Sequence, residues 1–466
     1  MSTPAVDFAA LDRYIHDHIR DWMEELGVLC AVPSVSARHE AIQPCAEAVA
    51  DLLSRRGFKT SVTSVDGGHP VVLGHASAPD SARTMLFYNH YDVQPPEPLP
   101  LWESPPFELT ERDGAVYARG AKDDKGELVA RLAAIDALRA VMGGYPCQLT
   151  WLVEGEEEIG SPHLPAWIEK HRADVQADAA IWEEGQIDED GRPIVRLGAR
   201  GLLYVDLSVK TIARDAHSGA ANLLPNAAWR MAWALASIKG PDGRIRIPGF
   251  YDAVRKPTPA EEAMLSRLPN TSENTRREFG LDRLLDGVTD VERAYFTPTA
   301  NIAGIGAGYQ GAGSKTVIPS QAMAKMDFRL VPDQDPIDIL EKLREHLRAE
   351  GFDGVKIDVL AAQPPGLTDP DAPIVRLTAE VAGEVYGKPA LIVPLTGGTT
   401  PMYPVHHPRR ACGEPRRRLG FEESSPLAER VHEAGRFRER GQAHRQALGS
   451  LRGQMKGEGL DQSSPS

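Results

Sequence analysis

The first half of the chain alternates between helical spacing and short apolar runs. Residues 7–56 are predicted to be mainly helical, since apolar residues from Leu11 to Leu26 recur on one helix face and a second helix is expected around Cys45–Leu53. An amphipathic helix is expected at Glu127–Met142. Three apolar runs predict buried strands at Thr84–Asn89, Gln148–Val153 and Ala179–Trp182. This alternation predicts an α/β fold, with a mostly parallel sheet covered by helices on both faces.

The pattern changes after Gly201. Leu202–Lys210 alternates as a half-exposed strand does, and helices are expected at Pro225–Ile238 and Pro336–Glu350. Further strands are expected at 300–305, 315–318 and 322–330. We therefore expect the first domain to cover residues 1–200 and to resume at 366–404. A smaller α+β domain at 201–365, with a helical insertion near 255–295, would lie between these segments.

Composition then narrows the class of protein. The 466 residues are 42% hydrophobic and 25% charged, which is ordinary for a globular protein, and their net charge of −14 disfavours nucleic acid as a partner. No apolar run approaches the roughly 20 residues of a membrane span, and the N-terminus lacks a secretory pattern. Four scattered cysteines, Cys30, Cys45, Cys147 and Cys412, are expected to be reduced thiols. These features predict a cytoplasmic protein with no membrane partner.

One histidine and many carboxylates follow the predicted strands. His90 and Asp92 come directly after the first strand, and a metal-bound imidazole commonly donates its second N–H to a carboxylate. A glycine-bounded loop contains Asp123 and Asp124, whose charges suit a cation better than a phosphate. The alternatives are a structural His–Asp pair and an aspartate that caps the following helix.

A third acidic group strengthens the case for metal. Glu154, Glu156, Glu157 and Glu158 lie within five residues after the second strand, and they would repel one another without a cation. Glu183-Glu184 ends the third strand in the same way. Ligands bind at strand ends in open α/β sheets, so the pattern predicts a two-metal site. A solvated acidic loop is the alternative.

These motifs together resemble the M20 family of zinc metallopeptidases. In chain order they are NHYDVQP, ARGAKDDKG, EGEEEIGS, DAHSG and KTVIPS with FRLVP. The similarity runs from about residue 15 to residue 404 and is greatest to carnosinase-like and cytosolic non-specific dipeptidases. It implies a catalytic domain with an inserted lid and dimerisation domain. It also implies a homodimer that cleaves dipeptides or short peptides with a free C-terminal carboxylate.

The resemblance also implies two divalent metal ions, Zn, with Mn and Co compatible with the same ligands. His90 and Glu183 would hold one ion, Asp123 would bridge both, and Glu158 would hold the second. Glu184 is the alternative to Glu183, because the register is uncertain by one residue.

The same resemblance implies the catalytic and substrate-binding residues. Asp92 would orient the liganding histidine, and Glu157 would be the general base that takes a proton from the bridging water. The partner subunit's His217 would stabilise the developing oxyanion. Arg329 would grip the terminal carboxylate of the substrate, with Thr316 near the same end.

The resemblance ends near Pro404. The family has a further zinc ligand, a histidine in a late H-x-x-N-E-like motif, which this chain lacks, although Gly397–Met402 still match the GGT-x-P segment. From Val405 to Ser466 the chain has eleven Arg, one Lys and no Ile, Trp or Tyr. We expect this aberrant tail at 405–466 to leave the chain weakly active or inactive.

A shift of reading frame is our hypothesis for the tail. One permitted set of codons for Ser425–Ala434, read one nucleotide later, encodes Val-His-Ser-Pro-Asn-Glu-Tyr-Thr-Lys, which contains the missing motif. The alternative is a genuine basic tail for an acidic partner.

Two other functions stay open. One is an N-acyl-amino-acid deacylase of the acetylornithine or succinyl-diaminopimelate type, and the other is an inactive truncated product.

Overall fold

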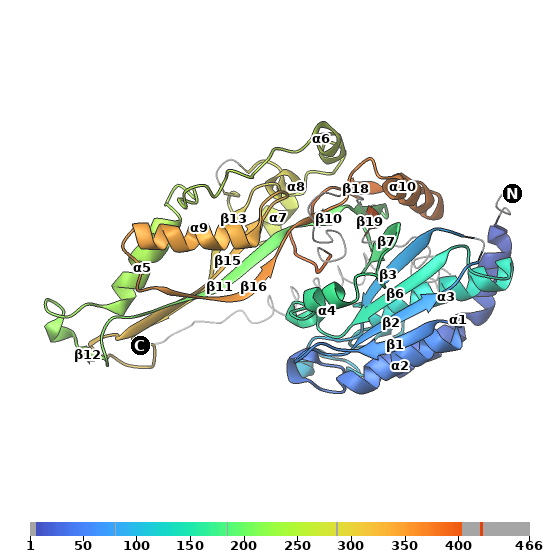
Figure 1. The fold of residues 1–466 in the computed structure, drawn as a ribbon, viewed down its shortest axis with the longest axis horizontal. Coiled ribbons are helices and arrows are strands. Elements are labelled where there is room, and N and C mark those ends of the chain that lie inside the picture. The colour runs from blue at the N-terminus through green and yellow to red at the C-terminus, as the bar shows by residue number, and fades with distance from the viewer. Residues whose placement is uncertain (1–5, 80, 184, 286–287, 403–419, 423–466) are drawn as a thin grey trace, which may run out of the picture.

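The computed structural model describes residues 6–79, 81–183, 185–285, 288–402 and 420–422. The two largest sheets lie toward opposite ends of an elongated molecule (Figure 1). We call residues 6–199 with 366–402 the large region, and residues 201–363 the small region. The chain crosses between them where β10 (Gly198–Ala199) pairs with β17 (Gly366–Leu367).

The large region contains a six-stranded sheet in the order β1-β2-β6-β3-β7-β19. Its strands are β1 (Lys59–Thr63), β2 (Val71–Ala76), β3 (Thr84–His90), β6 (Gln148–Glu154), β7 (Ala179–Trp182) and β19 (Gly420–Glu422). The last four in spatial order are parallel, whereas β1 and β2 pair antiparallel at one edge. The expected α/β fold is therefore confirmed, with a mixed sheet.

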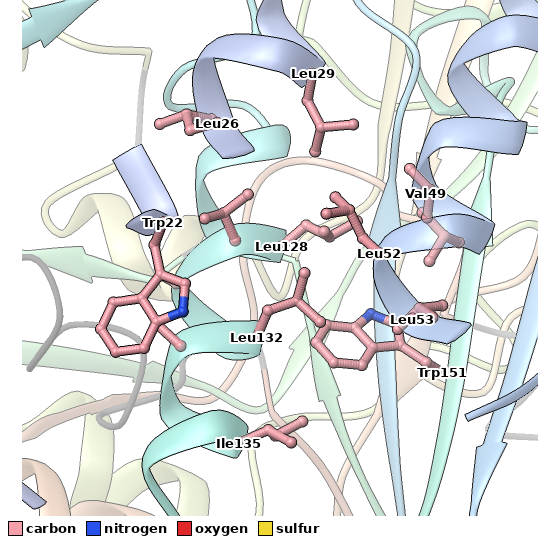
Figure 2. Packing of buried hydrophobic residues seen from close by; sticks show 14 of the residues in the cluster. Trp22, Leu26, Leu29, Val49, Leu52, Leu53, Leu128, Leu132, Ile135 and Trp151 are labelled. Atoms are coloured by element: carbon pink, nitrogen blue, oxygen red, sulfur yellow. The ribbon is translucent and has the colours of Figure 1, made fainter. Parts of the chain in front are cut away.

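Helices cover both faces of this sheet. One face packs against α1 (Phe8–Cys30), α2 (Ile42–Arg55) and α3 (Lys125–Met142), and the other against α4 (Leu164–Lys170). Figure 2 shows leucines of α1, α2 and α3 in one cluster with Trp151 of β6. The expectation of an amphipathic α3 is wrong, because every residue from Lys125 to Ile135 is buried. α1 packs along α3 and covers the face that would otherwise meet water.

The small region contains an antiparallel sheet in the order β13-β15-β11-β16. Its elements are β11 (Gly201–Lys210), α5 (Ala227–Ile238), β13 (Thr299–Ala307), β15 (Gln321–Leu330), α9 (Pro336–Ala349) and β16 (Lys356–Gln363). Side chains along β11 alternate between buried and half-buried, as the sequence predicts, because α5 and α9 cover one face. A short pair, β12 (Ala216–His217) with β14 (Val317–Ile318), lies at the end far from the large region (Figure 1).

The remaining elements are short or peripheral. The predicted helical insertion contains α6 (Pro259–Leu265), α7 (Ser272–Glu278) and α8 (Val291–Ala294). The others are β4 (Thr110–Arg112), β5 (Ala115–Tyr117), β8 (Gln186–Ile187), β9 (Pro193–Arg196), α10 (Pro373–Tyr386) and β18 (Leu391–Val393). Within the described ranges, no helix is long and apolar enough to cross a bilayer.

The core predicts a clear difference between two leucines. Leu132 of α3 is fully buried, whereas Leu101 is 77% exposed. Leu132→Ala should lower the free energy of unfolding by about 2–5 kcal/mol, because it leaves a cavity, and Leu101→Ala should change it by less than about 0.5 kcal/mol. Urea unfolding followed by tryptophan fluorescence measures both. Equal shifts for the two variants would contradict this packing.

Candidate functional site

His90 ends β3 and lies among carboxylates at the carboxyl edge of the sheet. Its ring is 1% exposed. Nδ1 lies 3.1 Å from the carbonyl oxygen and 3.4 Å from Oδ1 of Asp92, and Nε2 lies 2.9 Å from Oδ1 of Asp123. Burial disfavours the charged ring, but the carboxylates of Asp123 and Asp92 still raise the pKa of His90 well above its ordinary value. The expected His90–Asp92 contact and the Asp123 loop thus meet here.

Asp92 holds a second segment besides the histidine. Its carboxylate is fully buried, and it accepts the backbone N–H of Glu157 at 3.2 Å and that of Glu158 at 3.1 Å. These residues begin a short 3-10 turn, Glu157–Ile159. One carboxylate therefore fixes both His90 and the turn that carries two of the predicted functional residues. This second contact was not expected from the sequence.

The two aspartates of the glycine-bounded loop differ in their surroundings. Asp123 points toward His90 with its carboxylate 57% exposed, whereas Asp124 is fully buried. Oδ2 of Asp124 accepts bonds from the Asn89 side chain and from the His90 backbone, at 2.8 and 3.0 Å. Burial raises the pKa of Asp124 to about 6. The alternative of a capping aspartate is wrong, because Asp124 precedes α3 but its side chain makes no capping bond.

The two glutamates of the 3-10 turn both have raised pKa values. Burial raises the pKa of Glu157 to about 7. Repulsion from Glu158 and Asp92 raises it further, and together these effects outweigh the nearby His90 ring, which lowers the pKa. Burial and the nearby Asp123 carboxylate likewise raise the pKa of Glu158. A divalent cation among these groups would relieve their mutual repulsion.

The carboxylate of Glu158 also has a neutral partner. Nε2 of Gln94 donates to its Oε2 at 2.9 Å and to its backbone oxygen at 3.0 Å. We did not single out Gln94 from the sequence, although it lies inside the NHYDVQP motif, and that position is the signal that would have found it.

Glu183 follows β7 at the same edge. Its backbone oxygen accepts from the buried guanidinium of Arg131, which also binds the Tyr88 carbonyl oxygen at 2.7 Å. Glu184, the alternative ligand, lies outside the described residues. The part of Glu183 in the site stays a prediction.

The fit of this site to metal ions rests on its donor set. Across the described segments, no group of three or more His, Cys, Asp or Glu side chains is close enough to hold an ion as placed. The pair that does converge joins an imidazole nitrogen to a carboxylate oxygen at 2.9 Å, beside two glutamates with raised pKa values. Nitrogen and carboxylate oxygen are donors that Zn²⁺ accepts, so the residues present fit divalent ions.

His217 and Thr316 lie together, but far from His90. Nδ1 of His217 accepts the backbone N–H of Gly219 at 3.0 Å, and Nε2 lies 3.3 Å from Oγ1 of Thr316. A neutral ring would then carry its proton on Nε2. Both side chains are exposed at the end of the small region that is remote from the large sheet (Figure 1). Within one chain the fold therefore separates them from the metal-binding candidates.

Arg329 lies at the junction of the two regions instead. It projects from β15, and its Nη1 donates to Oγ1 of Thr399 at 2.7 Å. Thr399 belongs to the GGT-x-P segment of the large region. The two residues predicted to bind substrate are thus split, with Arg329 at the junction and Thr316 at the remote end.

Known proteins resemble this chain over most of its length. The family model described as "Peptidase family M20/M25/M40" matches residues 86–414. The chain is 31% identical to the Cys-Gly metallodipeptidase dug1 of Schizosaccharomyces pombe over 284 residues, which span 60% of each chain. It is 30% identical to the Beta-Ala-His dipeptidase of Homo sapiens over 372 residues, covering 74% of this chain and 73% of the relative.

The fold is also similar to a solved structure. The crystal structure of an M20 family metallo-carboxypeptidase, Sso-CP2 from Sulfolobus solfataricus, matches with a TM-score of 0.80 and 32% sequence identity. The match covers 89% of this chain and 98% of that chain.

The contacts of Asp92 predict a strong effect of a small change. Asp92→Asn puts an amide N–H₂ opposite one of the two backbone N–H donors, so the turn at Glu157 should move and zinc should bind about 10–100-fold more weakly. Competition with a zinc-binding dye measures the affinity. Asp66→Asn, at an exposed position, is the control and should bind zinc as the unchanged chain does. Equal affinity in the two variants would contradict the anchoring by Asp92.

Proposed function

Because the chain belongs to the peptidase family M20/M25/M40, we propose that it hydrolyses the peptide bond of dipeptides or short peptides with a free C-terminal carboxylate. The contact of His90 with Asp123 beside the Glu157–Glu158 turn is the observation that carries this proposal. The named dipeptidases among the relatives support the size of the substrate.

Two divalent ions would be held by four of the residues at the sheet edge. His90 and Glu183 would bind one ion, Glu158 the other, and Asp123 both. A set of imidazole and carboxylate ligands can bind Zn, and it can also bind Mn or Co. When bound, such ions supply Lewis acidity, which acidifies water and polarises the substrate carbonyl.

Glu157 would be the general base. Asp92 accepts the backbone N–H of Glu157, and this bond keeps the Glu157 side chain close to His90 and Glu158. In that position it would take a proton from the attacking water and deliver it to the leaving amine. Asp92 would keep the His90 ring and the turn in register while this proton moves.

Arg329 would bind the terminal carboxylate of the substrate. Its guanidinium lies where the two regions meet, and its contact with Thr399 brings a hydroxyl to the same place. A planar guanidinium can bind both oxygens of a carboxylate, which favours peptides with a free C-terminus over blocked ones.

The partner subunit's His217 and the partner's Thr316 would complete the site in a homodimer. Their distance from His90 within one chain supports action in trans (Figure 1).

The small region offers apolar surface for such a dimer. Trp229 and Trp233 of α5 stack with ring centroids 5.7 Å apart and stay 59% and 55% exposed. β13 is also an edge strand of its sheet. Exposed aromatic pairs of this kind are typical of interfaces.

The tail would limit this activity. The family's late histidine ligand is missing, which would leave the second ion with Asp123 and Glu158 alone among side chains. The four histidines of the tail, His406, His407, His432 and His444, fall on residues that the structure does not describe. We therefore propose that the chain as written binds fewer than two ions and turns over slowly.

Metal content and turnover test the proposed function together. The chain as written should contain fewer than two zinc ions and hydrolyse dipeptides weakly, and a chain with the shifted frame restored should gain both. Glu157→Gln in the restored chain should lower turnover by at least about 100-fold, because it removes the base, while its zinc content is unchanged.

Three results would count against the proposal in different ways. Two zinc ions and rapid dipeptide turnover in the chain as written would contradict the missing ligand. Faster hydrolysis of N-acetyl or N-succinyl amino acids than of dipeptides would favour the deacylase. No turnover of either substrate class by the restored chain would contradict the enzyme itself.

The tryptophan pair predicts the oligomeric state. Sedimentation velocity should show a dimer for the unchanged chain. Trp229→Ala combined with Trp233→Ala should give a monomer, because the change removes the two exposed aromatic side chains proposed to anchor the interface. Phe279→Ala, which changes a side chain 67% exposed in the helical insertion, is the control and should stay dimeric. A monomeric unchanged chain would contradict the homodimer.

A further inference from the structure

Arg200 lies where the chain crosses from β10 to β11, and it ties three segments together. Its Nη2 donates to the carbonyl oxygens of Thr297 and Arg329, at 3.0 and 3.3 Å. Its backbone N–H donates to the carbonyl oxygen of Gly398 at 3.0 Å. The residue before Thr399 and the backbone of Arg329 are therefore both held by the same residue.

The charge of Arg200 is buried and poorly balanced. The side chain is 5% exposed, its Nε has no hydrogen-bond partner, and its bonds are to neutral carbonyl groups rather than to a described carboxylate. Burial and the like charge of Arg329 lower the pKa of Arg200 to about 10. A buried cation whose charge is only partly balanced is costly, which makes this junction attractive to a negatively charged ligand.

The opposing carboxylate of Asp327 is already shared. Oδ2 of Asp327 lies 4.0 Å from Nε of Arg329, and its Oδ1 accepts a bond from Asn301 at 2.8 Å. Asp327 also raises the pKa of Arg200, so one carboxylate faces two guanidinium groups. The two arginines with Asp327 leave one positive charge in excess.

We propose that Arg200 is a positioning and specificity-determining residue for the carboxylate site formed by Arg329 and Thr399. It holds the carbonyl of Arg329 and the segment before Thr399 in place, so that the side chains of Arg329 and Thr399 face the same ligand. Its own charge is balanced when a carboxylate binds there. The inference rests on the proposed function, in which Arg329 binds the substrate terminus.

A purely structural arginine and a specificity-determining one differ in a measurable way. Loss of a structural residue weakens binding of charged and neutral ligands alike. Loss of the buried charge weakens binding of the carboxylate and leaves the matching amide nearly unaffected, because only the carboxylate interacts with net charge.

The experiment measures this ratio on the full-length chain by isothermal titration calorimetry. The probes are 5-aminopentanoate, which has the length of glycylglycine but no peptide bond, and 5-aminopentanamide. The unchanged chain should bind the carboxylate at least about tenfold more tightly than the amide. Arg200→Gln should reduce this preference to less than about threefold, whereas Arg200→Lys, which keeps the charge, should retain most of it.

Arg56→Gln is the matched control. Arg56 is equally buried, at 6% exposure, but it pairs with Glu25 and Asp136 in the large region, so its loss should leave the preference unchanged. If Arg200→Gln does not fold, Asp327→Asn decides instead. Removal of that opposing carboxylate should raise the preference, and an unchanged or smaller preference would overturn the proposal.

The outcomes separate this inference from the function on which it rests. If Arg200→Gln keeps the preference, or weakens both probes by the same factor, while Arg329→Gln abolishes the preference, Arg200 has no specificity role. If the unchanged chain does not prefer the carboxylate, recognition of a free C-terminus fails, and the role of Arg200 fails with it.

Discussion

The arrangement of the site depends on one buried carboxylate. Asp92 has no access to water, so its oxygens must be satisfied inside the protein. They are satisfied by the backbone of Glu157 and Glu158, with the ring of His90 close by. Three features follow from this constraint: the imidazole is oriented, the acidic turn is held against the end of β3, and carboxylates that repel each other are kept close. The repulsion appears as raised pKa values for Glu157 and Glu158.

A complementary charge lies where the two regions meet. The edge of the large sheet is rich in carboxylates, whereas the junction with the small region holds Arg200 and Arg329. A ligand with a positive or metal-binding part and a carboxylate part would match both. The junction is also a mechanical link, because the same arginines bond to backbone or side-chain groups of both regions. Binding there would therefore affect how the regions are held relative to each other.

Local pattern predicted several of the elements whose burial is one-sided or complete. The helical spacing of α1 and the apolar runs of β3, β6 and β7 were interpreted correctly, as was the alternation of β11. The strands β1, β2 and β16 were not predicted. β1 and β16 are exposed or half-buried and carry a weak pattern, whereas β2 is almost wholly buried and was missed despite its apolar residues. The helix α3 was predicted, but its amphipathic character was predicted wrongly. A helix covered by both the sheet and α1 needs apolar or satisfied residues on every side, which the spacing alone does not reveal.

The sequence by itself determined the class of enzyme, and it predicted a site at the ends of strands because acidic motifs and one histidine follow apolar runs. It also determined the family, through five motifs in order. Only the tertiary structure decided which residues meet. It joined Asp92 to the backbone of a turn 65 residues away, separated His217 from His90, and set Arg200 behind Arg329. These contacts depend on how distant segments pack and on which buried polar groups must find partners, and neither is encoded in local spacing.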